Sequence, residues 1–147
     1  MLDKLRERLH NYAPLFLRFG IGLVFLLFAV QKLGTPEQGR AEIQLLLNLK
    51  LGGAAALNYT LGVAELMVAA SFFTGTFIKW TSLLGTFMVL MFFGGLISKY
   101  GFSQDPTLNR DIGLLGGLLT LWLLGSGPIS IDAWFAKKKT QQDQTTN

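Results

Sequence analysis

Ionisable side chains inside otherwise apolar stretches are the residues of this sequence that could do chemistry. The clearest is Glu65, the one charged residue in LGVAELMVAA at 61–70. An ionised side chain at mid-depth in a bilayer costs roughly 2.5–3.5 kcal/mol on insertion scales, so such a residue normally faces the protein interior and finds a partner. Glu65 is therefore expected to form a structural ion pair, to carry a proton, or to contact a ligand.

Three further polar positions interrupt or flank the apolar stretches. Arg18 lies inside the first stretch, Lys32 lies at its end, and the pair Arg110–Asp111 opens the last stretch. With a helical rise of about 1.5 Å per residue, Arg18 lies roughly 9 Å deeper than Glu65 and Lys32 roughly 12 Å shallower. These depths favour an outer cluster of Lys32 with Asp111. They leave open an inner pair of Glu65 with Arg18.

Each alternative for Glu65 predicts different surroundings. As a structural ion pair it would only fix the register of two helices. As a ligand contact it would meet the polar head of a lipophilic molecule, with Tyr59, Phe25 or Trp122 as an apolar wall. As a proton carrier without a cationic partner it would stay neutral, because burial disfavours the charged form of a carboxyl group.

The composition indicates that these stretches lie in lipid. The chain has 147 residues, of which 50% are hydrophobic and 15% are charged, and its mean hydropathy is +0.41. Soluble domains usually carry about a quarter charged residues. The net charge of +4 then reflects basic residues flanking membrane helices, and nucleic-acid binding is not expected.

Residue types that hold metals are nearly absent. The chain has no Cys and a single His, His10. Disulfides, thiolate catalysis, and iron–sulfur or zinc sites held by Cys are thereby excluded. One His cannot supply the paired axial ligands of a membrane b-type haem. We therefore expect no haem, iron–sulfur cluster or metal in this chain, and any redox metal would belong to another subunit.

Four apolar blocks predict an all-α integral membrane protein, because a span needs about 20 apolar residues. We predict a bundle of four transmembrane helices at about 13–33, 53–74, 78–98 and 110–125. A cleaved signal peptide is the alternative for the first block, but no convincing small-residue cleavage site follows it. The outer connection, 34–52, is expected to hold an interfacial helix, with a short strand or loop as the alternative.

The two ends of the chain are polar. Residues 1–12 predict a cytoplasmic amphipathic segment, either a surface helix or a frayed terminus. Residues 136–147 are basic and polar and predict a disordered cytoplasmic tail after a membrane domain at 13–135. Seven Lys and Arg residues flank the predicted inner side and five flank the outer side. This bias favours a multi-pass protein of the inner (plasma) membrane with both termini in the cytoplasm.

The order of these motifs resembles the DoxX/DoxD family of small four-span membrane proteins over roughly residues 12–135. The stretches that carry the resemblance are LRFGIGLVFLLFAVQKLG, LGVAELMVAASFFTG and NRDIGLLGGLLTLWLLGSGPISID. The resemblance implies a membrane subunit linked to an oxidoreductase system, as the DoxD branch belongs to thiosulfate:quinone oxidoreductase. It carries over five polar positions as site candidates: Arg18, Lys32, Glu65, Arg110 and Asp111.

The first hypothesis is that the helix bundle binds quinone or another lipophilic redox molecule. Glu65 would be the catalytic, proton-exchanging group. The ligand-binding residues would be Arg18, Lys32, Tyr59, Arg110 and Asp111. The expected partners are the lipid bilayer and either a redox subunit or a second copy of the chain. The sequence does not decide whether the chain is itself an enzyme. The alternative is a non-catalytic scaffold or assembly protein, or a small transporter, in which the charges only fix packing.

Overall fold

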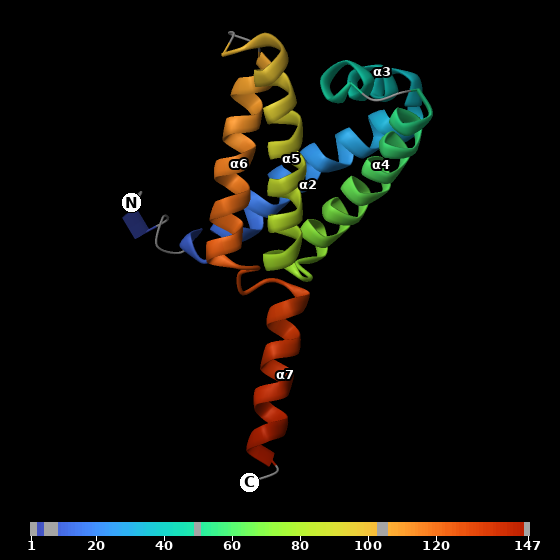
Figure 1. Cartoon of the computed structure of the whole chain (residues 1–147). Helices are drawn as coiled ribbons and strands as arrows, with labels where there is room; N and C mark the ends of the chain where they lie inside the picture. Colours follow the sequence, from blue (N-terminus) through green and yellow to red (C-terminus); the bar gives the residue numbers. More distant parts are fainter. Residues whose placement is uncertain (1–2, 5–8, 49–50, 103–105, 146–147) are drawn as a thin grey trace.

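The described part of the chain is entirely helical between its turns. The computed structural model describes residues 3–4, 9–48, 51–102 and 106–145, and no strand occurs among them. Six helices longer than one turn follow one another in this part (Figure 1), namely α2 (Ala13–Gly34), α3 (Pro36–Leu47), α4 (Leu51–Thr74), α5 (Ile78–Tyr100), α6 (Pro106–Leu124) and α7 (Ile131–Thr145). The all-helical prediction is therefore confirmed for the described residues.

The local sequence explains why α2 ends and α3 begins where they do. The backbone N–H and the hydroxyl of Thr35 both donate to the carbonyl of Gln31, which closes the last turn of α2. Pro36 then opens α3, where its missing N–H costs nothing. Asn48 ends α3 with a left-handed backbone. The connection at 34–52 is thus a helix from Pro36 to Leu47, and residues 49–50 lie outside the described part.

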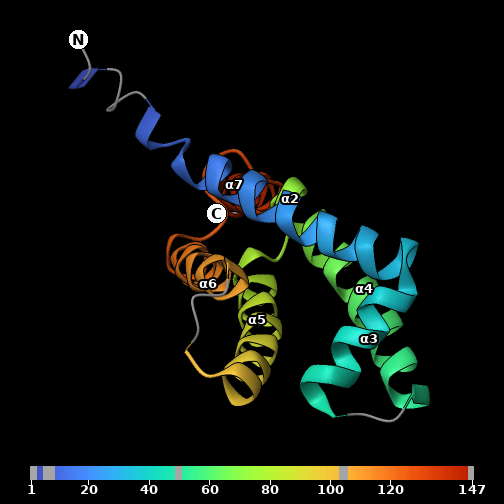
Figure 2. The same cartoon turned by 90° about the horizontal axis from the view of Figure 1, so that it is seen from above.

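Two pairs of helices make up the bundle. Helices α5 and α6 run side by side, while α2 and α4 pack together and run aslant to them (Figures 1 and 2). Their shared core contains Phe25 of α2, Phe72 of α4 and Leu118 of α6, all fully buried. Helix α3 folds back against α2 and α4. This arrangement brings the polar ends of α2 and α6 to the same region as the middle of α4.

Long apolar helices with exposed apolar side chains identify a membrane protein. Three helices in the described part are long and apolar enough to cross a bilayer: α2, residues Gly52–Thr74 of α4, and α5. Helix α6 is not among them. Met67, Phe87 and Leu123 point outward with more than 65% of their surface exposed, as expected where lipid replaces water as the solvent.

The C-terminal segment differs from the prediction of a disordered tail over 136–147. Helix α7 continues through Thr145 and projects away from the bundle (Figure 1). The Lys and Gln residues that make this segment polar are also strong helix formers, as is Ala, and Asp132 suits the positive end of the helix. For the N-terminal segment, 1–12, residues 1–2 and 5–8 lie outside the described part.

Candidate functional site

A cavity of about 290 Å³ lies between α2, α4, α5 and α6, with α3 at its rim. We call it the interhelical cavity. Its apolar walls come from α2 and α5 and consist of Phe25, Phe28, Met88, Val89, Phe92 and Leu96. Its polar groups come from α2, α3, α4 and α6 and are Gln31, Lys32, Glu42, Glu65, Arg110 and Asp111. Four of the six predicted site residues therefore line one cavity.

Lys32 and Glu65 form a buried ion pair on its wall. Lys32 Nζ lies 2.9 Å from Glu65 Oε1, and the two side chains are 9% and 4% exposed. The ammonium also lies 5.4 Å from the ring centre of Phe28 and 5.2 Å from that of Phe92. The other carboxylate oxygen, Glu65 Oε2, is buried with no hydrogen-bond partner among the described residues.

The inner pair of Glu65 with Arg18 left open by the depth estimate is therefore wrong. That estimate counted residues along upright helices, whereas α2 and α4 run aslant and pack closely on each other. Gly62 of α4 permits this approach, because a Cβ there would lie 2.9 Å from Leu33 and 3.2 Å from Lys32 Cβ. Asn58 also donates from Nδ2 to the carbonyl of Lys32 at 2.9 Å, which fixes the end of α2 against α4.

Arg110 and Asp111 reach the cavity from α6. Arg110 Nε and Nη2 each lie 2.9 Å from Asp111 Oδ1. Asp111 is buried, whereas the Arg110 side chain is 43% exposed. The guanidinium lies 4.7 Å from the ring centre of Phe28. Lys32 and Asp111 thus share one cavity, where the sequence had predicted an outer cluster.

Arg18 lies at the opposite end of the bundle and binds a loop instead of lining the cavity. Its side chain is buried, and it donates to the carbonyl oxygens of Ser126 at 2.7 Å and Ile129 at 2.8 Å. Gly75, with φ +74°, makes room for the guanidinium. We call this arrangement the Arg18 clasp. It holds the loop between α6 and α7 and does not contribute to the interhelical cavity.

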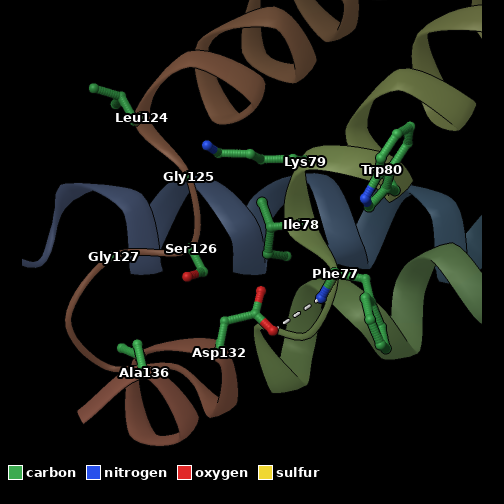
Figure 3. Close-up of a pocket in the computed structure, with 11 residues that line it drawn as sticks. Phe77, Ile78, Lys79, Trp80, Leu124, Gly125, Ser126, Gly127, Asp132 and Ala136 are labelled. Carbon is green, nitrogen blue, oxygen red and sulfur yellow. Dashed lines mark hydrogen bonds between the residues drawn. The ribbon is translucent and has the colours of Figure 1, made fainter. Parts of the chain in front are cut away.

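A wider groove of about 480 Å³ opens beside the clasp, between α5, the end of α6 and α7. Figure 3 shows the carboxylate of Asp132 directed at the backbone nitrogen of Phe77, which donates to Oδ1 at 3.2 Å. This contact ties α7 to the turn between α4 and α5. The groove therefore lies at the junction that fixes α7.

Tyr59 was predicted as part of the ligand wall and is not. It is 67% exposed on α4 and does not line the interhelical cavity. Of the other wall candidates, Phe25 lines the cavity and Trp122 does not. A helix repeats every 3.6 residues, so side chains four apart share a face. Phe28, four residues before Lys32, could have been found from that spacing. Phe92 and Glu42 had no such signal, because they come from other helices.

The residues present do not form a metal centre in the part of the chain that the structure describes, where no group of three His, Cys, Asp or Glu side chains is placed to hold an ion. The interhelical cavity instead offers aromatic walls, two ion pairs and one unpartnered carboxylate oxygen. Such a set can bind and orient a small molecule that has an apolar ring and polar oxygen or nitrogen atoms.

Comparison with known proteins shows the family of the chain. No curated protein sequence and no solved structure matches the chain. A family model, described as methylamine utilisation protein MauE, matches residues 10–107. This finding corrects the resemblance to the DoxX/DoxD family, which rested on single charges within apolar helices, a pattern many membrane proteins share. The match includes both partners of the Lys32–Glu65 pair, and the chain belongs to the MauE family.

Proposed function

We propose that this protein is a four-span subunit of the inner (plasma) membrane that serves an oxidation system. In this proposal it binds quinone or another lipophilic redox molecule in the interhelical cavity. The family is described by methylamine utilisation, and an amine becomes usable carbon and nitrogen through oxidation. Quinones are the lipid-soluble molecules that take up the electrons of such reactions inside a membrane.

The observation that carries the proposal is a buried ion pair that opens on an aromatic cavity. Lys32 and Glu65 supply a donor and an acceptor where the walls are Phe25, Phe28 and Phe92. The volume of about 290 Å³ is at the lower limit of ligand sites, which span roughly 300–1,000 Å³. One substituted ring fits this space, with its isoprenoid tail left in the surrounding lipid.

The proposal gives each residue a role that suits its position. Lys32 and Arg110 hold hydrogen-bond donors toward the ring oxygens, and the phenylalanines exclude water. Glu65 is the group that exchanges a proton, at Oε2, because Oε1 is engaged by Lys32. Bound quinone would supply the two-electron redox chemistry, and the protein would supply binding, orientation and the proton acceptor.

The proposal includes α6 as the fourth helix that crosses the membrane. Helix α6 runs along α5 and presents Leu119, Leu123 and Leu124 outward, which suits a lipid-facing helix. Arg110 and Asp111 reduce its apolar character, but both engage the cavity side rather than lipid. With four spans, the excess of Lys and Arg at the chain ends favours cytoplasmic termini.

The test is the quinone content of the purified protein. Val89→Phe adds a ring into the cavity, whereas Leu90→Phe adds the same ring at a neighbouring, 49% exposed position. We expect mass spectrometry to find stoichiometric quinone in the wild type and Leu90→Phe, and little in folded Val89→Phe. Absence of quinone from all three proteins, or equal amounts in both variants, would favour the scaffold or transporter alternative.

A further inference from the structure

The unpartnered oxygen of Glu65 is the feature of the interhelical cavity that distinguishes between the redox forms of a ligand. Glu65 is 3% exposed, and its Oε2 has no hydrogen-bond partner among the described residues. Leaving a buried charged acceptor unsatisfied is costly, so such atoms are normally matched by a donor. An acceptor without a donor, on the wall of a cavity, indicates that a donor arrives with the occupant.

The side chains of the cavity do not supply this donor. Lys32 gives its hydrogen bond to Oε1 and places its ammonium against the rings of Phe28 and Phe92. Arg110 is engaged with Asp111 and stacks on Phe28. A ligand must therefore carry its own O–H or N–H to the position facing Glu65 Oε2.

We propose that the interhelical cavity selects the reduced, hydroxyl-bearing form of its ligand, a hydroquinone, with Glu65 Oε2 accepting the hydrogen bond of one hydroxyl group. This inference rests on the proposed function and names the redox form that the site prefers. A hydroquinone presents an O–H donor. The oxidised quinone presents a carbonyl oxygen, whose lone pairs would face those of the carboxylate.

The cations already seated on the aromatic rings of the cavity favour this neutral donor over an amine cation. The two ion pairs, Lys32 with Glu65 and Arg110 with Asp111, cancel in formal charge. Glu42, exposed at the rim, adds one negative charge. Two of the three phenylalanine rings that line the cavity, Phe28 and Phe92, already hold the cations of Lys32 and Arg110. Methylammonium would have to displace one of them and break its ion pair, so the site is expected to reject it.

Selection of the reduced form changes the energetics of the bound couple. Any site that binds the reduced form more tightly raises the midpoint potential of the bound molecule. For a two-electron couple, a tenfold preference corresponds to about 30 mV. The bound hydroquinone would therefore give up its electrons less readily than free hydroquinone in the membrane.

Three matched probes test the preference on the wild-type protein in lipid nanodiscs under anaerobic conditions. They are a short-chain benzoquinone, its hydroquinone, and the dimethyl ether of that hydroquinone, which keeps the shape but has no donor. We expect calorimetry to show hydroquinone binding at least tenfold more tightly than either of the other two, with methylammonium unable to compete.

Glu65→Gln gives the reciprocal test. Its amide oxygen can still accept from Lys32, while its NH₂ group replaces Oε2 and turns an acceptor into a donor. The preference should then reverse in favour of the quinone. Glu37→Gln is the matched control, because Glu37 is an 89% exposed carboxylate on α3 outside the cavity, and it should keep the wild-type ratio.

The outcomes separate the two proposals. Equal binding of all three probes would overturn the preference and leave the proposed function standing, with Oε2 satisfied by water. Binding of none of them above simple partitioning into lipid would overturn both. Competition by methylammonium would show a cation site instead. If Glu65→Gln fails to fold, the comparison of hydroquinone with its dimethyl ether decides the question in the wild type.

Discussion

Lys32 Nζ and Glu65 Oε1 lie 2.9 Å apart and join α2 to α4 where both helices border the same cavity. The pair therefore fixes the register of two helices and, in the same place, shapes the wall of a candidate ligand site. These two roles predict different responses to substitution, since one concerns stability and the other concerns binding.

Glu65→Ala should destabilise the protein by about 3–5 kcal/mol, because it leaves the ammonium of Lys32 buried without its partner. Lys32→Ala should cost a similar amount, because it leaves the carboxylate of Glu65 buried without its cation. The double variant should be more stable than the sum of the single losses predicts, with a coupling of about 0.5–3 kcal/mol. Reversible unfolding in detergent measures all four proteins. Additive losses would show that the two side chains do not stabilise each other.

Arg18→Lys should loosen the loop between α6 and α7 without changing ligand binding. A lysine keeps the charge but lacks the planar fork that reaches two carbonyl oxygens at once. Losing one hydrogen bond to a charged group costs about 1.5–3 kcal/mol. Hydrogen exchange should quicken at residues 125–130 and remain unchanged around Glu65. Unchanged exchange in the loop would rule out the clasp.

Gly75→Ala should be far more harmful than Gly20→Ala. A Cβ at Gly75 would meet the Arg18 guanidinium and lie 2.5 Å from Ser130 Cβ, on a backbone with φ +74°. We expect a loss of at least about 2 kcal/mol. Gly20 has nothing within 4 Å of a built Cβ, so alanine there should be neutral or slightly stabilising. Thermal unfolding in detergent compares the two, and equal melting temperatures would contradict the packing at Gly75.

The four-span arrangement predicts that α6 carries the chain across the membrane. Because the chain has no Cys, a single introduced thiol reports its own location. Phe102→Cys, at an 84% exposed position after α5, should react with a membrane-impermeant maleimide added outside cells. Thr140→Cys on α7 should react only after the membrane is opened. Labelling of both positions from the same side would show that α6 does not cross.

The helices could be predicted because their signal is local. A block of 20 apolar residues predicts a membrane helix without knowledge of the rest of the fold, because a helix satisfies all its backbone hydrogen bonds within the segment. The interior position of Glu65 follows from the same reasoning, since a carboxylate facing lipid would be too costly. For the segment that forms α3, the sequence favoured a helix but left a short strand or loop as the alternative. Pro36 and Asn48 mark the start and end of this helix, but these residues also occur in loops.

The partners of the charged residues could not be predicted, because they depend on how the helices cross. Residue counting placed Lys32 far above Glu65, whereas the packing of α2 on α4 brings the two side chains together. Tyr59 was chosen for its residue type, but its face of α4 points away from the cavity. The segment 136–147 was predicted to be disordered because it is polar, although its Lys and Gln residues also favour a helix.

The Arg18 clasp also affects how the chain enters the membrane. Arg18 lies 108 positions before its acceptor at Ser126. At ordinary synthesis rates of about 5–20 residues per second, roughly 5–20 s pass between the emergence of the two residues. During that interval the first helix carries an unmatched guanidinium. We therefore expect α2 to settle into its final position only after α6 has been made, so a ribosome that stalls before Ser126 would leave an incompletely inserted protein for cellular quality control to remove.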